Sequence, residues 1–556
     1  MSEKLVLLYF VFVIVYILIG AIVLFKNKHS KMFPILFLIF ISFLGFILRV
    51  AACFLGYPYV IHPDEKYIVE RTKDMIMRNS WEADVYNWPG HFSIKFDAIL
   101  FTIGSYIKYG TGVVAAWEDE HEIFFYFIAR IFSSVCGTIM IPLAYMICEK
   151  IKKKSGYIAA ILIACFPVLI VHSGYATCDI PIAMLEMLGI YLAMQYLEKG
   201  NSKWRYALCV VVGAAVTCKY PGAFLSILVI YVVIADALKN KSIKTFFIEG
   251  IQGIAIAFAT LFVIAPNLVT NFQKLIEIFS EESNDVHRGQ NGLGYFGNLK
   301  YYLSVIADNS GYIAILFAVV GFVWVFYKKK RNIYPIFVGI IYILILSVLD
   351  LHWERWGTPF YASIIMLMAV GILWLLEYDR IKKNEGKKHY KYIEIVVCIL
   401  VVLIFANTIT AGIRNSLEEL AQENRVKALA YCKDNDITTD NTAYDGYSPL
   451  LMQSPNKIKV SVDEEGKIVV KDNIKYMITS SYMYDGYYAE AEKYADILQR
   501  YIAIEKYGIL LKEWKEYDKN SKFACVNTLY NAKEIFEIIN GGDVGTTIRI
   551  YKVPNE

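Results

Sequence analysis

Two adjacent carboxylates, Asp64 and Glu65, follow a long apolar run in the segment Ile61-His62-Pro63-Asp64-Glu65-Lys66. A carboxylate that is partly desolvated at a membrane face becomes a stronger base, and it suits general-base catalysis on a hydroxyl group. A structural role is also open, because Asp64 could cap a helix that begins at Lys66. The two roles are compatible, so Asp64 is the first catalytic candidate.

Ionisable residues at or within the apolar runs form a second group of candidates. Each costs about 2.5–3.5 kcal/mol at mid-bilayer on insertion scales, so such residues usually face a bundle interior or a cavity. The group consists of Arg130, Asp179, Glu186, Lys219 and Arg355. Plainer interpretations stay open: Lys219 could extend to the headgroups, Arg355 could be an interfacial anchor, and Glu186 could bind a neighbouring helix.

Several histidines accompany these residues. His62 and His91 lie in the same long loop as Asp64, and His352 lies three residues before Arg355. Two histidines and Glu65 could bind a divalent metal, but no spacing in the sequence demands a metal site. The sequence therefore leaves the cofactor unknown, with a metal at Glu65 as one option.

The composition predicts an α-helical polytopic membrane protein. The 556 residues are 57% hydrophobic and 19% charged, with a mean hydropathy of +0.43. Runs of about 18 or more apolar residues are long enough to cross a bilayer as helices. We expect about twelve spans, near residues 4–25, 33–56, 122–148, 156–172, 180–197, 204–219, 221–238, 246–266, 310–328, 334–350, 357–377 and 393–412. The net charge of +4 does not indicate a nucleic-acid partner.

The distribution of basic residues predicts the orientation of these spans. Lys and Arg concentrate in short cytoplasmic loops, and six loops that should share one side are all basic: 26–31, 150–154, 199–205, 239–244, 328–331 and 380–391. We therefore expect the 57–121 loop, the 267–309 loop and residues 413–556 on the outer side. Asp64, Arg130, Asp179, Lys219 and Arg355 then fall at or near one outer face. Richness in Ile, Lys, Asn and Tyr, with no ER-retention tail, favours a prokaryotic plasma membrane.

Two domains are expected. Residues 1–412 form the transmembrane domain, whose long first loop should hold interfacial helices near 67–78 and 91–109. Residues 413–556 should form a small extracytoplasmic α/β domain, with helices at 417–432 and 489–502 and strands at 457–462, 467–470, 475–479 and 546–553. Whether Cys432 and Cys525 form a disulfide is left open.

An Asp-Glu pair in a long first outer loop resembles the GT-C membrane glycosyltransferases. The closer similarity is to the branch of protein O-mannosyltransferases and aminoarabinose transferases. Further segments resemble this branch in the same order: Asn87–His91, Arg130–Ser133, His172–Pro181, Gly213–Tyr220 and Tyr476–Tyr482. One departure concerns the metal, because the aminoarabinose transferases carry a glutamate and a lysine where this chain has Asn87 and Trp88.

The resemblance implies an inverting transfer of a hexose or pentose from a polyprenyl-phosphate donor. The acceptor would be an outward-facing hydroxyl of a protein, a lipid or a cell-surface glycan. Asp64 would act as the base, and Glu65 would orient the acceptor or hold a metal. Donor phosphate would be bound by Arg130, Lys219 and Arg355, and donor or acceptor contacts would come from His62, His91, Asp179 and His352.

A different class of function is a multi-pass lipid or solute transporter, or a non-catalytic membrane scaffold. Buried charges serve ion pathways as readily as they serve phosphate binding. Two features favour the enzyme: the charges gather at one face and not at the midplane, and a long first loop has no evident role in transport. No fixed-period repeat supports an inverted-repeat transporter.

Overall fold

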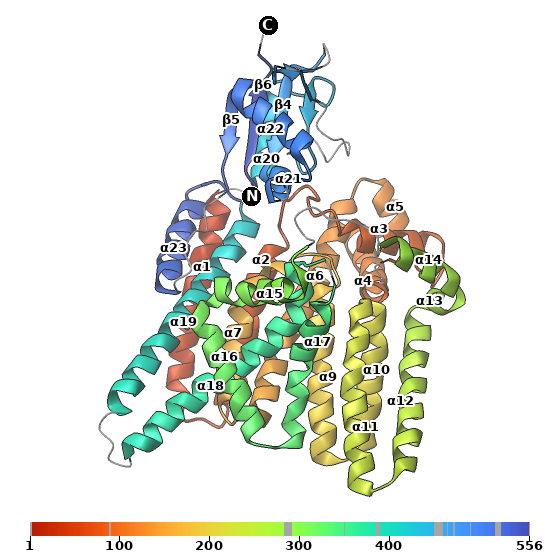
Figure 1. Ribbon diagram of the computed structural model, residues 1–556, viewed down its shortest axis with the longest axis vertical. Coiled ribbons are helices and arrows are strands. Elements are labelled where there is room, and N and C mark those ends of the chain that lie inside the picture. Colours follow the sequence, from red (N-terminus) through yellow and green to blue (C-terminus); the bar gives the residue numbers. More distant parts are fainter. Residues whose placement is uncertain are drawn as a thin grey trace.

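The computed structural model describes residues 3–87, 90–282, 292–349, 351–384, 390–449, 460–463, 465–470, 473–489, 491–516 and 524–554. Most of these residues form a helical bundle, and a small sheet stands at one end of it (Figure 1). We call the end of the bundle that faces this sheet the sheet end.

Eight helical segments of the described chain are long and apolar enough to cross a membrane, judged by length and composition. They comprise α1 (Glu3–Lys26), α2 (Phe33–Ala52), α6 (Glu122–Ile151), α9 (Asp179–Lys199), η1 (Tyr220–Leu225) with α11 (Ser226–Asn240), α12 (Ile243–Ile264), η3 (Glu354–Gly357) with α18 (Thr358–Asn384), and α19 (Tyr390–Leu420). The count rises to ten if two bent helix pairs are each one span.

The two bent pairs and two shorter segments account for the other four expected spans. The pair α7 (Ser155–Cys165) and α8 (Pro167–Ser173) bends by 54°, and the pair α15 (Gly294–Ser310) and α16 (Tyr312–Tyr327) bends by 112°. The shorter segments are α10 (Ser202–Cys218) and η2 (Arg331–Phe337) with α17 (Val338–Leu346). Helices therefore cover most of each expected span, and the predicted fold class is confirmed.

The long first loop folds into α3 (Lys66–Met77), α4 (His91–Tyr109) and α5 (Val113–Glu118). Helix α3 packs on α4, and α4 packs on α6 and α10. The second long loop holds α13 (Asn267–Thr270) and α14 (Phe272–Glu282), and α14 lies near α3 in Figure 1. The two predicted first-loop helices are confirmed, and both long loops cover the sheet end of the bundle.

The C-terminal sheet has the strand order β1-β4-β6-β5. Strand β1 (Thr442–Tyr444) runs parallel to β4 (Tyr476–Ser480), and β6 (Ile548–Lys552) pairs antiparallel with both β4 and β5 (Ile509–Trp514). A separate hairpin joins β2 (Ser461–Val462) to β3 (Ile468–Val469). Helices α21 (Ser481–Ala489) and α22 (Ala495–Tyr507) complete this region, and Ala428 and Leu429 of α20 (Asn424–Asp434) pack into its core.

Several sequence expectations for this region were wrong. The expected helix 417–432 is broken, because Glu423 accepts a hydrogen bond from the Arg425 backbone (2.9 Å) and starts α20 separately from α19. The second expected helix begins at Ala495 and not at residue 489. Strands β1 and β5 were missed, and residues 457–459 of one expected strand lie outside the described chain. Cys432 is buried and free, so no disulfide joins it.

The last helix, α23 (Ala524–Ile539), was also missed, and it returns to the bundle. It packs along α19 and contacts α1 (Figure 1). Within it, Asn531 donates to Asn407 and Thr410 of α19, each at 3.4 Å. The C-terminal region is therefore attached to the bundle through a helix as well as standing above it.

Candidate active site

Asp64 lies between α2 and α3 at the sheet end of the bundle. Its carboxylate forms an ion pair with Arg355 of η3, although 291 residues separate the two in sequence. No side chain caps the start of α3. The expected capping role of Asp64 is therefore wrong, and its side chain pairs with Arg355 instead.

A second ion pair lies beside the first. Asp179 begins α9, Lys219 follows α10, and the Lys219 ammonium donates to the Asp179 carboxylate at 2.6 Å. Thr358 joins the two pairs, because its hydroxyl lies within hydrogen-bonding distance of the carbonyl oxygens of Asp179 (2.9 Å) and Arg355 (3.0 Å). Asp179 also interacts electrostatically with Arg355. Two acids and two cations from four parts of the chain thus meet in one cluster, which we call the charge cluster.

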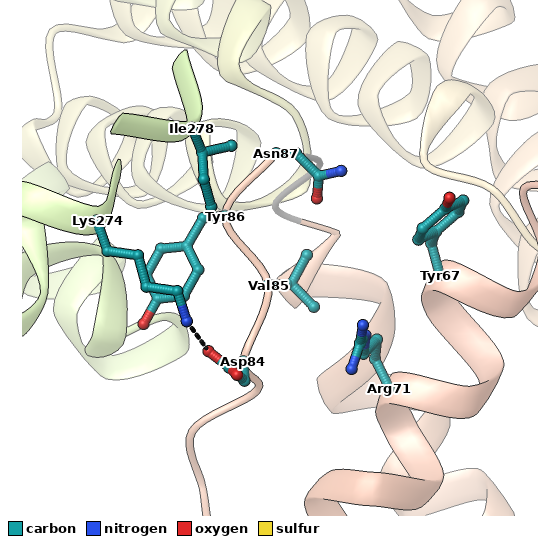
Figure 2. A pocket seen from close by; sticks show the side chains of 8 residues that line it. All are labelled: Tyr67, Arg71, Asp84, Val85, Tyr86, Asn87, Lys274 and Ile278. Atoms are coloured by element: carbon teal, nitrogen blue, oxygen red, sulfur yellow. Dashed lines mark hydrogen bonds and ion pairs between the residues drawn. The ribbon is translucent and has the colours of Figure 1, made fainter. Parts of the chain in front are cut away.

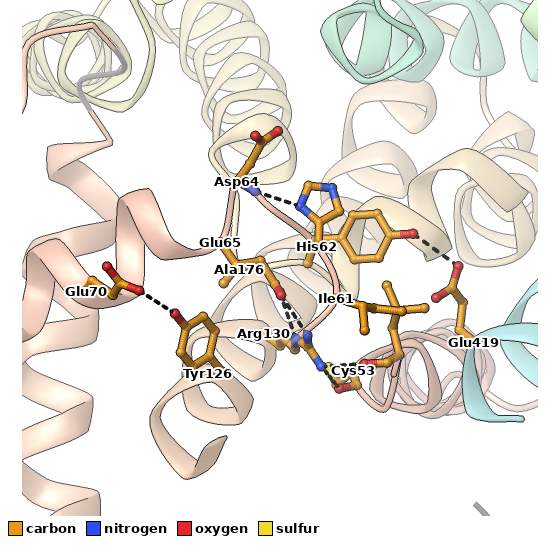
Figure 3. Close-up of polar contacts among 12 residues, drawn as sticks. Cys53, Ile61, His62, Asp64, Glu65, Glu70, Tyr126, Arg130, Ala176 and Glu419 are labelled. Carbon is orange, nitrogen blue, oxygen red and sulfur yellow. Dashed lines mark hydrogen bonds and ion pairs between the residues drawn. The ribbon is translucent and has the colours of Figure 1, made fainter. Parts of the chain in front are cut away.

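The Glu65 side chain points away from that of Asp64 and toward Arg130 (Figure 3), and it is fully buried. Arg130 binds its carboxylate in a bidentate manner, with both N–O distances 2.7 Å, and the backbone of Ala176 donates to it at 3.0 Å. Arg130 also donates to the carbonyls of Cys53 and Leu55, at 2.8 and 3.1 Å. Burial alone would raise the pKa of Glu65, but the Arg130 charge outweighs burial and holds that pKa below its ordinary value.

Glu65 and Arg130 form a buried ion pair. The Glu65 side chain is 0% exposed and that of Arg130 is 1% exposed, and each neutralises the charge of the other. Arg130 and Glu65 are therefore paired with each other in this structure, and neither residue joins the charge cluster. Both oxygens of Glu65 are engaged, so the residues present do not fit the metal site suggested for it. In the described part of the chain, no group of three or more His, Cys, Asp or Glu side chains is placed to hold a metal ion.

His62 belongs to the wall of the site. Its Nδ1 accepts a hydrogen bond from the Asp64 backbone at 3.3 Å, and its ring lies 4.5 Å from the ring of Tyr175. Tyr175 in turn donates to Glu419 of α19 at 3.1 Å. Burial lowers the pKa of His62 to about 4, so the imidazole is neutral at physiological pH. His62 thus helps to fix the loop that carries Asp64.

The other expected contact residues do not join the charge cluster. His91 is buried and hydrogen-bonds Asn267 of α13 at 3.0 Å, which ties α4 to the second long loop. His352 is buried against the ring of Tyr301, with centroids 4.7 Å apart. Both histidines are thus buried against neighbouring parts of the protein, and their expected contacts with donor or acceptor stay predictions. Glu186 hydrogen-bonds Ser363 of α18 at 3.3 Å, as expected for a structural partner.

Two tyrosines that the sequence did not single out approach the site from the C-terminal region. Tyr447 and Tyr482 lie with ring centroids 4.0 Å apart. Tyr482 interacts electrostatically with Arg355, and Tyr447 interacts with Asp64. Arg425 of α20 donates to the carbonyl of Ile61 at 3.2 Å and so joins the C-terminal region to the loop that carries Asp64. Their only sequence signal was the position of Tyr482 at the end of the Tyr476–Tyr482 segment.

These observations define a class: a polytopic membrane protein with an acidic and basic site at one end of its bundle, under a small α/β region. The family model described as dolichyl-phosphate-mannose-protein mannosyltransferase matches residues 125–269, which hold Arg130, Asp179 and Lys219. The structure is similar to that of the Archaeoglobus fulgidus oligosaccharyltransferase in the apo form. The identity is 12% and the TM-score 0.50, over 88% of this chain and 74% of the other.

Two further solved structures are of ArnT from Cupriavidus metallidurans. The apo state matches at 13% identity and a TM-score of 0.47, over 80% of this chain and 92% of that one. The structure bound to undecaprenyl phosphate matches at 12% identity and a TM-score of 0.47, over 83% and 95%. No curated protein matches the sequence. The family-model match confirms the resemblance to protein mannosyltransferases over residues 125–269, and the match to the Archaeoglobus structure shows a shared fold.

Proposed function

We propose that this protein is an inverting glycosyltransferase that moves a monosaccharide from a polyprenyl-phosphate donor to an acceptor hydroxyl, with Asp64 as the general base. The observation that carries the proposal is the Asp64–Arg355 ion pair beside Asp179–Lys219. A base and two cations, which the reaction needs together, lie in one place. The description of the matched family names a mannose linked to dolichyl phosphate, which agrees with a lipid-phosphate donor.

The chemistry follows from the roles of these charges. Asp64 takes the proton of the acceptor hydroxyl while the oxygen attacks the anomeric carbon from the side opposite the phosphate. The carbon–oxygen bond to the phosphate breaks, and its electron pair leaves with the polyprenyl phosphate. One displacement inverts the configuration of the sugar. Negative charge grows on the leaving phosphate, and fixed cations stabilise that charge.

Arg355 is the first phosphate ligand in this proposal. Its planar guanidinium binds phosphate oxygens in a bidentate manner. In the structure this group neutralises Asp64, so a donor phosphate that draws Arg355 away also releases the carboxylate to act as a base. Lys219 supplies the second cation, and Asp179 fixes its position. The buried Glu65–Arg130 pair holds the Asp64 loop against α6, so we assign Glu65 and Arg130 positioning roles.

We place the site on the extracytoplasmic side of a cell membrane. The six basic loops join helix ends that lie away from the C-terminal sheet, as the connection between α11 and α12 shows in Figure 1. Lysine and arginine favour cytoplasmic loops. The sheet end and residues 413–556 would then face outward as a separate domain, with Tyr447 and Tyr482 over the site. A prokaryotic plasma membrane stays our preferred location.

The test uses purified protein in nanodiscs and a panel of radiolabelled polyprenyl-phosphate hexoses and pentoses. We expect at least one donor to lose its sugar in the presence of a membrane extract that supplies acceptors. The anomeric configuration of the product, read by NMR, should be opposite to that of the donor. Absence of transfer from every donor, together with movement of label across a sealed vesicle, would instead favour the transporter.

A further inference from the structure

A cavity of about 310 Å³ lies between the first and second long loops and has no part in the proposed chemistry. Three segments line it (Figure 2): α3, the extended stretch before α4, and α14. The lining residues are Tyr67, Arg71, Asp84, Val85, Tyr86, Asn87, Lys274 and Ile278. We call this space the α3–α14 cavity.

The walls of the α3–α14 cavity expose polar and apolar surface in about equal parts and carry more positive than negative charge. Lys274 binds Asp84 at 2.9 Å and also lies over the ring of Tyr86, 4.6 Å from its centroid. Arg71 stands on the opposite wall in Figure 2, and its contact with Asp74 is a loose 3.6 Å. The side chains of Arg71, Lys274 and Asp84 are 44%, 49% and 52% exposed, so a solute can reach them. Two cations against one carboxylate favour an anionic ligand.

The α3–α14 cavity is tied to both halves of the charge cluster. Tyr67 comes three residues after Asp64, and its backbone donates to the Asp64 carbonyl at 3.1 Å. On the other wall, the Tyr86 carbonyl accepts a hydrogen bond from Tyr220, the residue after Lys219. A molecule bound in the cavity therefore lies next to the segments that carry the base and one phosphate-binding cation.

We infer that the α3–α14 cavity binds an anionic sugar, bearing a phosphate or a carboxylate, as part of the acceptor. This inference rests on the proposed function, because the ligand's neighbouring hydroxyl is the one that Asp64 would deprotonate. Arg71 and Lys274 supply charge-assisted hydrogen bonds to the anionic group. The ring of Tyr86 offers an apolar face to the sugar, and Asn87 and Asp84 suit its hydroxyls. The volume is at the small end for ligand sites, which fits a short group and not a long glycan.

The experiment measures binding by isothermal titration calorimetry to the full protein in nanodiscs. The probes are glucose 6-phosphate, glucuronate, glucose and inorganic phosphate. We expect one or both sugar acids to bind at least about tenfold more tightly than glucose and than inorganic phosphate, a difference of about 1.4 kcal/mol. Comparison of the two sugar acids distinguishes a phosphate from a carboxylate as the natural anion.

Variants assign the binding to this cavity. Arg71→Gln and Lys274→Gln should each weaken sugar-acid binding about tenfold, whereas Lys73→Gln, on the same helix but outside the cavity, should not. Asp64→Asn should bind the probes as wild type does, so binding can stand even where transfer fails. Equal binding of glucose, equal binding of inorganic phosphate, or unchanged binding in both cavity variants would overturn the inference. Because the side chains of Arg71 and Lys274 are about half exposed, the melting temperatures of these two cavity variants should match that of wild type.

Discussion

Replacement of Glu65 by glutamine tests whether this residue holds the site together or takes part in the chemistry. The substitution keeps the size of the side chain and removes its charge. Arg130 then remains in the protein interior with a full positive charge and two backbone carbonyl partners, Cys53 and Leu55. The protein loses one bidentate interaction with two N–O distances of 2.7 Å, and it cannot hydrate the arginine in exchange.

The expected cost is about 3–5 kcal/mol, the usual result when one partner of a buried ion pair is removed. A surface pair provides the matched control. Glu198 pairs with Lys150 but is 49% exposed, so Glu198→Gln should cost about 0–1 kcal/mol. The two substitutions make the same chemical change and differ in burial.

The assay is unfolding by SDS in mixed micelles, followed by tryptophan fluorescence, with donor turnover measured on the same samples. We expect Glu65→Gln to unfold at a clearly lower SDS fraction than wild type and Glu198→Gln. Turnover of the folded fraction should fall much less than it falls in Asp64→Asn. Wild-type stability combined with abolished turnover would refute our reasoning and return Glu65 to a catalytic role.

Three further predictions follow from the same structure. First, the stability advantage of wild type over Glu65→Gln should be complete above the ordinary glutamate pKa of about 4.3. Because the folded protein lowers the pKa of Glu65, this advantage should disappear as pH falls through that lower value. A stability advantage that grows on acidification would contradict the Glu65–Arg130 ion pair. Second, Gly321→Ala should destabilise the folded protein by about 1–3 kcal/mol, because the new methyl group would meet the Leu367 carbonyl where α16 packs on α18. The control is Gly250→Ala in α12, whose methyl group would meet nothing within 4 Å. In the same SDS titration this control should be neutral or stabilising. Third, Arg355→Gln should lower the rate of sugar transfer about 100–1000-fold without loss of folding, and Arg355→Lys should recover part of it; equal rates for Gln and wild type would remove Arg355 from phosphate binding.

The helices were predictable because their signals are local. Apolar runs located the eight helical segments that are long and apolar enough to cross a membrane. Gly90 and Gly110 bracket α4 in left-handed conformations that glycine adopts at low cost. Broken or short elements were harder to predict from the sequence. Strand β5 has the sequence Ile-Leu-Leu-Lys-Glu-Trp, which lacks the alternation of a half-buried strand. Helix α23 mixes Asn, Lys and Glu among its apolar residues, so nothing local indicated that it packs on α19.

The site was predictable as a set of residues but not as a set of partners. Charge and orientation placed Asp64, Arg130 and Arg355 near one end of the bundle, and several pairings were then compatible with the sequence. Packing decides among them: Arg130 lies inside α6 and meets Glu65, whereas Arg355 comes from a short turn and meets Asp64. Adjacent residues on one loop point in opposite directions, and no sequence pattern carries that information.

The most direct test of the account is the rate of sugar transfer by Asp64→Asn, measured with a donor that wild type uses. The matched control is Asp119→Asn, an exposed carboxylate in the same long loop. We expect Asp64→Asn to fold normally, to bind donor, and to transfer sugar about 100–10,000-fold more slowly, as loss of a general base requires. The control should transfer at the wild-type rate. Undiminished transfer by folded Asp64→Asn would contradict the account.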